Sequence, residues 1–263
     1  MAEQHDGAQK RRAWLVLGSL FTVASLIFGV QQTVSLVAHE ERTDVRLIDA
    51  EGLAGLRIDS EAGAIDIVGT DRDDIAITAR ISDGLSPTDY DVDVVGDVLE
   101  VRVRCTTPMG SPWCRVGLRI EVPARVRIDV RSEADRISVR SVDGSVLAGS
   151  ENGAVAAEAL GGPTVLRSEN GSVEASRMAT GGVEAHSENG SVRVDLAVPA
   201  VSVLASTENG SAEVVVPSGP TSYAVTVDSG NGRAENLVRS DPASDATISV
   251  RSANGDAIVR YSG

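Results

Sequence analysis

Glutamate recurs at one fixed place in a short repeated phrase of this sequence. SENGSV occupies residues 168–173 and again 187–192, and SENGAV occupies 150–155. The glutamates that precede the repeated asparagines are Glu151, Glu169, Glu188 and Glu208. A column of such carboxylates would attract counterions, and carboxylates in a groove also serve as general acid and base in polysaccharide-cleaving enzymes. Cation binding and acid–base catalysis are therefore the chemistries to weigh first.

Acid–base catalysis needs two carboxylates in different surroundings, and four equivalent glutamates lack that asymmetry. If they stack at a strand spacing of about 4.8 Å, each adjacent pair repels by about 0.9 kcal/mol in water. The shorter Gly-Gly and Asp nonapeptide of calcium-binding repeats is absent from the sequence. The column is then either a weak cation edge or a solvated acidic edge, and the sequence leaves both open.

Other catalytic side chains are scarce. Lys10 is the only lysine, which excludes a lysine nucleophile or Schiff base beyond residue 10. The histidines are His5, His39 and His186, and only His186 lies among the repeats. It falls on the outward phase of a predicted strand, where we expect a solvated side chain. We therefore expect no enzyme, and no catalytic, cofactor-binding or metal-ligating residue.

The two cysteines flank a turn-forming segment, CTTPMGSPWC, as Cys105 and Cys114. In an oxidising exterior such a pair is most simply a disulfide. A metal site is the alternative, but two cysteines without nearby histidine fall short of the usual four ligands. We expect a structural disulfide.

The phrase belongs to a longer repeat of about 20 residues. Successive Asn-Gly pairs are separated by 18, 19, 20, 22 and 23 residues. Apolar residues stand at even offsets on both sides of each pair, with Ser or Thr two residues before it, which is the period of a half-buried strand. The asparagines are Asn152, Asn170, Asn189, Asn209, Asn231 and Asn254.

Two all-β folds fit this pattern. In a β-solenoid (β-helix), each repeat is one coil and like residues stack, which would give some ten coils in a rod about 50 Å long. In an antiparallel meander or sandwich, the Asn-Gly pairs are hairpin turns. Asn-Gly is favoured where the backbone takes positive φ, so either fold explains the pair. Near-identical corners at near-constant spacing favour the solenoid.

An uncharged apolar run occupies residues 13–30 and helical character extends to 38, enough to cross a bilayer. Basic residues precede the run and Glu40 and Glu41 follow it, which predicts an inside N-terminus. We expect a cytoplasmic tail (1–12), a single-pass transmembrane signal anchor (13–38), a linker (39–44) and an extracytoplasmic β-repeat domain (45–263). The alternative is a cleaved signal peptide, although Leu36-Val37-Ala38 is a poor cleavage site.

The net charge of the chain limits the classes of partner that it can bind. The formal net charge is −14, which argues against nucleic acid because phosphate binding needs a basic face. The terminal coils of a solenoid expose unpaired edges, so self-association is a further hypothesis.

Several stretches together resemble a known family. They are LRIDSEAGAIDIVG, GLRIEVPARVRIDVRSEADRISV, the SENGSV copies and AEVVVPSGPTSYAVTVDSGNG, and they cover most of positions 55–260. In this order they resemble the bacterial putative adhesin family, a domain-of-unknown-function family of exported, stacked β-repeat proteins. The resemblance implies a β-helical fold at the cell envelope and no family-wide catalytic residues to carry over, and the family's name suggests adhesion. Asn-Gly-Ser replaces the Gly-Asp turns common in such repeats, which puts any cation contact at the corners in doubt.

The leading functional hypothesis is a non-enzymatic, membrane-anchored surface or envelope protein. Its acidic rod would contact wall polymer or another protein of the envelope. The alternative is the extracytoplasmic sensing or regulatory component of an envelope-stress system. A polysaccharide-active envelope enzyme is the third candidate.

Overall fold

The computed structural model describes residues 22, 40–83, 88–105 and 114–263. The predicted cytoplasmic tail and signal anchor lie outside this range, apart from Thr22. No helix among the described residues is long and apolar enough to cross a membrane.

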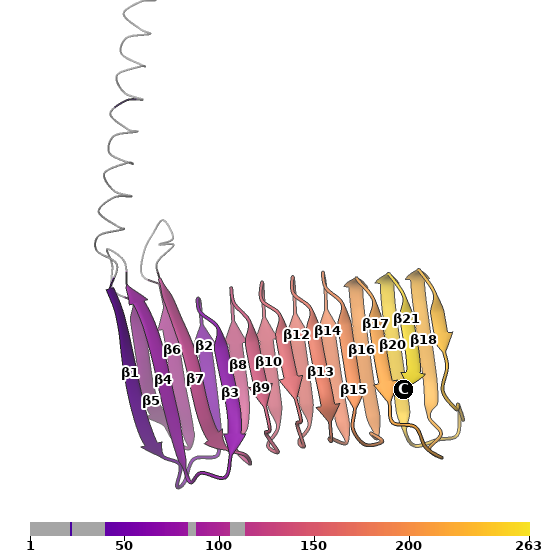
Figure 1. The fold of residues 1–263 in the computed structure, drawn as a ribbon, viewed down its shortest axis with the longest axis horizontal. Helices are drawn as coiled ribbons and strands as arrows, with labels where there is room; N and C mark the ends of the chain where they lie inside the picture. The colour runs from indigo at the N-terminus through magenta and orange to yellow at the C-terminus, as the bar shows by residue number, and fades with distance from the viewer. Residues whose placement is uncertain (1–21, 23–39, 84–87, 106–113) are drawn as a thin grey trace, which may run out of the picture.

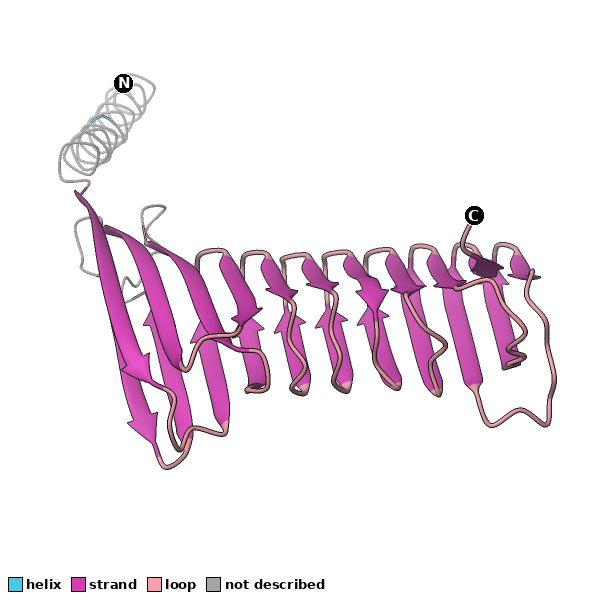
Figure 2. Ribbon diagram, turned by 60° about the horizontal axis from the view of Figure 1, so that its bottom comes forward, coloured by secondary structure: helices cyan, strands magenta, loops and turns pink. Residues whose placement is uncertain are grey.

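The described chain is all-β and forms two long, mostly parallel sheets that stack face to face (Figure 1 and Figure 2). Sheet I contains, in spatial order, β1 (Glu40–Asp49), β4 (Asp74–Asp83), β7 (Arg115–Pro123), β3 (Ile65–Thr70), β9 (Ile137–Arg140), β11 (Val155–Glu158), β13 (Val173–Met178), β15 (Val192–Leu196), β17 (Ala212–Val216), β21 (Ala257–Tyr261) and β19 (Ala234–Asn236). Sheet II contains β18 (Ala224–Asn231), β20 (Thr247–Asn254), β16 (Ser202–Asn209), β14 (Gly182–Ser187), β12 (Thr164–Ser168), β10 (Val146–Ser150), β8 (Arg127–Ser132), β2 (Gly55–Ser60), β6 (Val98–Arg104) and β5 (Asp89–Val95).

Each repeat contributes one strand to each sheet. β12 and β13 form one such coil, and they pair in parallel with β10 and β11 on one side and with β14 and β15 on the other. A meander with Asn-Gly hairpins would make these neighbours antiparallel. The parallel pairing is what the β-solenoid predicts.

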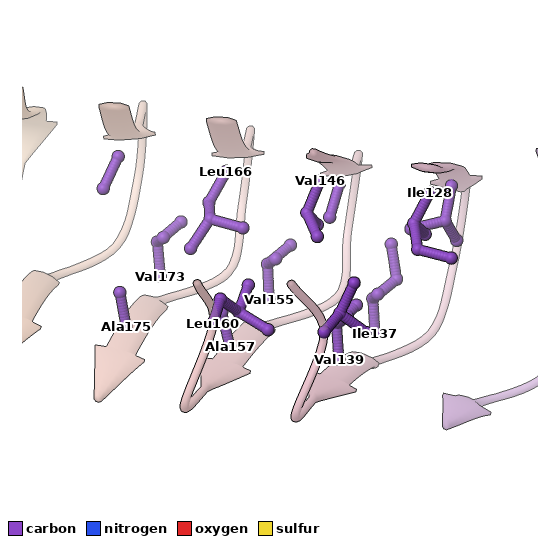
Figure 3. Close-up of a cluster of buried hydrophobic side chains, with 14 of the residues drawn as sticks. Ile128, Ile137, Val139, Val146, Val155, Ala157, Leu160, Leu166, Val173 and Ala175 are labelled. Atoms are coloured by element: carbon purple, nitrogen blue, oxygen red, sulfur yellow. The ribbon is translucent and has the colours of Figure 1, made fainter. Parts of the chain in front are cut away.

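The core is the thin space between the two sheets. Alternate residues point inward, so β10 has a strict buried and half-buried alternation in which Val146, Ala148 and Ser150 are buried. Figure 3 shows apolar inward side chains of successive coils, such as Ile128, Val146 and Leu166, lying between the facing strands. Burial of each valine or isoleucine stabilises the fold by about 1.5–3 kcal/mol, so many small columns replace one large aromatic core. Among the described residues, Tyr223 is the one aromatic side chain that is fully buried.

Chain order and spatial order differ at both ends of the rod. The last repeat, β20 and β21, lies between β16/β17 and the preceding repeat, β18/β19, which forms the outer coil. At the other end, β6 and β7 lie outside β2 and β3. The described chain therefore forms nine two-strand coils, close to the ten expected, in an order that the repeat spacing does not give.

Antiparallel strands close the N-terminal end. β4 pairs with β1 and β7 in sheet I, and β5 pairs with β6 in sheet II. β1 begins at Glu40, so the expected linker at 39–44 is wrong for residues 40–44, which belong to the sheet. The strand forms here because inward Ile48 packs against the core and every residue of β1 pairs with β4.

The predicted disulfide is confirmed. Cys105 and Cys114 are bonded, with their Cα atoms 5.9 Å apart. The bond joins the end of β6 to the start of β7, and so ties sheet II to sheet I within one coil.

Candidate functional site

The repeated asparagines lie in a single column at one corner of the solenoid. Each side-chain amide donates a hydrogen bond from Nδ2 to Oδ1 of its neighbour. The pairs are Asn170 to Asn152 at 3.0 Å, Asn189 to Asn170 at 3.1 Å, Asn209 to Asn189 at 3.0 Å, Asn254 to Asn209 at 3.0 Å and Asn231 to Asn254 at 2.9 Å. The ladder follows spatial order, so Asn231 ends it and Asn254 does not.

The serine of the phrase also links coils. The hydroxyl of Ser168 accepts a hydrogen bond from the Gly171 N–H at 2.8 Å and donates one to the Gly153 carbonyl of the adjacent coil at 2.9 Å. Ser187 and Thr207 donate in the same way, to Gly171 at 2.8 Å and to Gly190 at 2.7 Å. These inward hydroxyls are buried, and the bonds satisfy them.

The glycine of the phrase is required by close stacking. A Cβ added to Gly171 would lie 2.3 Å from the carbonyl oxygen of Gly153, and one added to Gly190 would lie 2.4 Å from that of Gly171. Neither glycine has a positive φ, and positive φ occurs only at Gly210 and Gly255 of the Asn-Gly glycines. The expectation that Asn-Gly marks positive φ is therefore wrong for most corners, where Gly instead lets adjacent coils approach.

Glutamate is the residue of the phrase that stacking leaves unused. Backbone hydrogen bonds place its copies one above another, for example from Glu169 N–H to Ser150 O at 3.1 Å and from Glu188 N–H to Ser168 O at 3.1 Å. Within the described chain, none of the ion pairs or hydrogen bonds involves the carboxylates of Glu133, Glu151, Glu169, Glu188 and Glu208. These side chains are free to meet a ligand.

The structure adds Glu61 and Glu133 to the four predicted glutamates. Glu133 N–H bonds to Ser60 O at 3.0 Å and Glu151 N–H to Ser132 O at 3.0 Å, which continues the same column. Sequence reasoning missed them because these coils read Ser-Glu-Ala without the Asn-Gly pair, although Ser followed by Glu was a sufficient signal. We call the six residues Glu61, Glu133, Glu151, Glu169, Glu188 and Glu208 the acidic edge.

Charge accumulates along the acidic edge. Partial desolvation of the exposed Glu133 carboxylate, reinforced by the charges of Glu61 and Glu151, raises the pKa of Glu133 above its usual value. At the N-terminal end of the edge, Arg104 lies 3.5 Å from a Glu61 carboxylate oxygen and 2.6 Å from Asp59, whose pKa it lowers. The edge is therefore neutralised at one end and uncompensated along the rest.

A shallow groove of about 660 Å³ runs beside the acidic edge on the outer face of sheet II. Its rim includes Glu133, Glu151, Glu169 and Glu188, and its floor includes Leu147 and Gly149. A Cβ at Gly149 would meet no atom within 4 Å, so the missing side chain is what leaves the floor open. Positive groups also line the groove, from Arg131 and Arg167.

His186 lies in the groove wall, on the outward phase of β14 as predicted. It is half-buried, and its Nδ1 lies 2.9 Å from the hydroxyl of Ser206 on β16. The neighbouring Arg167 pairs with Glu184 at 2.8 Å. Among the described residues no carboxylate is hydrogen-bonded or ion-paired to the His186 ring, so the pair lacks the orienting acid of a nucleophilic triad. Likewise, no three His, Cys, Asp or Glu side chains of this part of the chain converge to hold a metal ion.

No family model matches the chain. No curated protein matches it. Three solved structures are similar over most of its length. A "putative cell adhesion protein" from Clostridium sporogenes has 11% identity and a TM-score of 0.37, over 85% of this chain and 100% of its own. A "putative adhesin" from Bacteroides fragilis has 15% identity and a TM-score of 0.40, over 84% and 97%. A "putative adhesin" from Parabacteroides distasonis has 9% identity and a TM-score of 0.32, over 85% and 97%.

These structures carry the same description as the family that the repeats resemble. Each TM-score lies below 0.5.

Proposed function

We propose that this chain is a non-enzymatic, adhesin-like protein of the cell envelope. Residues 13–38 anchor it in the membrane with the N-terminus inside, and the exported solenoid binds an extended wall polymer or envelope protein. The acidic edge and the groove beside it form the contact surface. A ligand that carries positive groups along its length fits this surface.

The observation that carries the proposal is the unused glutamate. Ser, Asn and Gly of the repeated phrase each make a contact between coils that depends on the residue type, whereas the glutamate contributes only its backbone and its carboxylate bonds to no other described coil. Stacking does not need an acid at this place, because Ala253 and Gly230 occupy it in the last two coils. A row of unpaired carboxylates also opposes folding through mutual repulsion, by up to about 0.9 kcal/mol per adjacent pair before screening by salt. A row that is costly and dispensable for stacking is best explained by an external partner.

The stacked coils hold the glutamates of the acidic edge in a fixed arrangement that suits a repeating ligand. Hydrogen bonds between the coils that carry the repeated phrase hold its asparagines and serines in register, so the glutamates there keep a regular spacing of about 4.8 Å along the edge. A preorganised row loses little conformational entropy when a repeating ligand binds along it. The adjoining groove gives room for the ligand backbone, and Arg131 and Arg167 give acceptor groups of that ligand a place to bind.

The disulfide and the expected membrane anchor both fit a solenoid that is exported. A disulfide at Cys105 and Cys114 persists outside the reducing cytosol. The anchor and its charge asymmetry would leave the solenoid on that side of the membrane.

The test is co-sedimentation of the full-length chain, in nanodiscs, with wall material purified from the source cells. In the first variant, Glu169→Gln and Glu188→Gln together remove two charges from the acidic edge. The matched control removes two charges from the outer face of sheet I, by Glu174→Gln and Asp195→Asn. We expect the first variant to bind roughly tenfold more weakly, since two contacts of somewhat under 1 kcal/mol each are lost. The control should bind as the parent does.

A second pair of variants tests the groove by shape alone. Gly149→Phe fills the floor, and Gly117→Phe places the same ring on the outer face of sheet I, where a Cβ also meets nothing within 4 Å. Binding that is lost only with Gly149→Phe supports the proposal. Equal binding by both charge variants, or by both phenylalanine variants, would overturn it, as would hydrolysis of the wall material by the parent chain.

A further inference from the structure

The two ends of the rod are closed in different ways. At the N-terminal end, charged side chains stand on both edge strands. Asp44 and Arg46 take inward positions of β1. On β5 the inward Val92 and Val94 are apolar, and the charges are Asp89, Asp91 and Asp93 on the outer face. Arg46 on β1 pairs with Asp44 at 2.7 Å and lies over the ring of Tyr90 on β5, 5.2 Å from its centroid. In the pairing of β1 with β4, Arg46 is opposite the buried Ile77. Asp44 and Arg46 therefore occupy inward positions, where the inner strands carry apolar residues. Inward charges of this kind block pairing with another sheet.

At the C-terminal end, sheet II is covered only beside Tyr223, just before β18, where Tyr223 N–H bonds to Arg239 O at 3.2 Å and Asp241 N–H to Tyr223 O at 2.9 Å. β18 is an eight-residue strand that pairs with β20 along one side, and no strand of the described chain pairs along the other. Its inward Val225 and Val227 are half-exposed, whereas Ile248 and Val250, their partners in β20, are fully buried. Asp228 is the one charged residue of the strand. A long, apolar edge with little charge is a template for pairing with a further strand.

Sheet I is closed at the same end. β19 spans three residues and places Asn236 opposite Val259, at an inward position. Its Oδ1 accepts a hydrogen bond from the Val238 N–H at 3.1 Å, which turns the chain away from the sheet. The open edge is therefore confined to β18.

We infer that β18 is a dimer interface, where it pairs antiparallel with β18 of a second copy about a two-fold axis. A second copy is the fitting partner because a two-fold contact uses the same edge twice and closes. A head-to-tail filament would instead pair β18 with β5 of the next copy, where Asp89, Asp91 and Asp93 would repel Asp228. The inference is independent of the ligand proposed above.

The backbone selects the register of this pair. Ala224 donates its N–H toward sheet II, to Ala246 O at 2.8 Å, so the N–H groups of Val225, Val227 and Ser229 point to the open side. With the axis at Val227, each of these N–H groups points at a carbonyl oxygen of the other copy, and Asp228 of each copy lies across from Thr226 of the other. The carboxylate then meets a hydroxyl donor. Moving the axis to Asp228 would place two carboxylates opposite each other, which is unfavourable.

One consequence concerns the groove. In a continuous antiparallel sheet, outward residues of both copies lie on the same face. The dimer therefore presents two grooves on one face of a doubled rod, with the two N-terminal ends at opposite extremes.

The test uses opposite charges at one exposed position. Thr226→Asp sets two carboxylate pairs across the axis, and Thr226→Lys sets two opposite-charge pairs there. The dissociation constant of the full-length chain in detergent micelles is measured by sedimentation velocity over a concentration series. We expect it to rise about tenfold with Thr226→Asp and to fall about tenfold with Thr226→Lys. Thr43→Asp and Thr43→Lys are the matched controls, because Thr43 is exposed on the edge strand of the other end.

A dimer that responds with opposite sign to the two Thr226 variants, and not to the Thr43 variants, supports the interface. A parent chain that stays monomeric throughout the series would refute it. So would equal effects of the two charges at Thr226, or effects of the same size at Thr43.

Discussion

Gly171→Ala would place a methyl group 2.3 Å from the carbonyl oxygen of Gly153 in the adjacent coil. Gly171 has no positive φ, so alanine loses nothing through its own backbone conformation. The whole effect of the substitution comes from stacking. It therefore separates a glycine needed for close approach from a glycine needed for a left-handed turn.

The cost follows from the contacts at this corner. An ordinary carbon–oxygen contact needs roughly 1 Å more room, so the coils must part locally or the backbone must shift. Overpacking of this kind costs about 1–3 kcal/mol. Separation also stretches the hydrogen bonds from Ser168 to Gly153 (2.9 Å) and from Asn170 to Asn152 (3.0 Å), at about 1 kcal/mol each. We expect the free energy of unfolding to fall by about 3–5 kcal/mol.

The assay is urea unfolding of the full-length chain in detergent micelles, followed by the β-sheet signal in circular dichroism. Gly149→Ala is the control, because it changes a glycine on the neighbouring coil where a Cβ meets nothing within 4 Å. The control should be neutral, or more stable by up to about 1 kcal/mol, since glycine weakens a strand. If Gly171→Ala unfolds at the same urea concentration as the parent, stacking does not explain the corner glycines.

Three further substitutions test the asparagine ladder, the backbone strain at Ala159 and the Glu133 carboxylate. Asn189→Ala removes hydrogen bonds to Asn170 and Asn209, so the urea midpoint should fall by the equivalent of about 1 kcal/mol, less than for two buried bonds because water replaces part of the loss. Ala159→Gly relieves a φ of 53° and should raise the thermal midpoint by the equivalent of about 0.5–1 kcal/mol; an unchanged midpoint would show that this corner is unstrained. Glu133 has a raised pKa in the fold, so its ionisation lowers stability as the pH rises from the unfolded-state pKa through the folded-state pKa. Glu133→Gln should therefore be more stable than the parent at neutral pH, by a few tenths of a kcal/mol, with the gain vanishing in urea titrations below the ordinary carboxyl pKa.

The strands and their inward faces could be predicted because each repeat contains the alternating apolar pattern twice, once on each side of the corner. Val146, Ala148 and Ser150 before the corner and Val155 after it are buried, and even spacing was enough to place them. The reason for the corner glycine could not be predicted in the same way. Asn-Gly favours a tight turn in any fold, whereas the clash with the next coil exists only after the coils are stacked.

The order of the terminal coils was also beyond the sequence pattern. Val225, Val227 and Ser229 repeat the template as well as Ile248, Val250 and Ser252 do, so either strand could follow β16. Packing separates the two repeats. Ile248 is larger than Val225 and takes the fully buried place, while the repeat with Asn236 at an inward position of β19 ends the rod.

The candidate site was predicted in outline. The column of Glu151, Glu169, Glu188 and Glu208 follows from the repeat, and the structure extends it to Glu61 and Glu133. The groove depends on what lies beside the column. Gly149 of β10 and Arg167 of β12 are register partners on the outer face of sheet II, a relation that exists only across coils.

The two proposals assign different parts of the rod to different partners, and the repeat itself separates them. The acidic edge ends at Glu208, because the two outer coils place Ala253 and Gly230 where the others place glutamate. With the two-fold axis at Val227, Gly230 lies across from Ala224 of the second copy. Gly230 also lies close to the adjacent coil, because a Cβ there would be 2.7 Å from the Ala253 carbonyl oxygen, so a glutamate at 230 would require the backbone to shift. The same interruption that shows glutamate to be unnecessary for stacking leaves the end of the rod able to meet its copy.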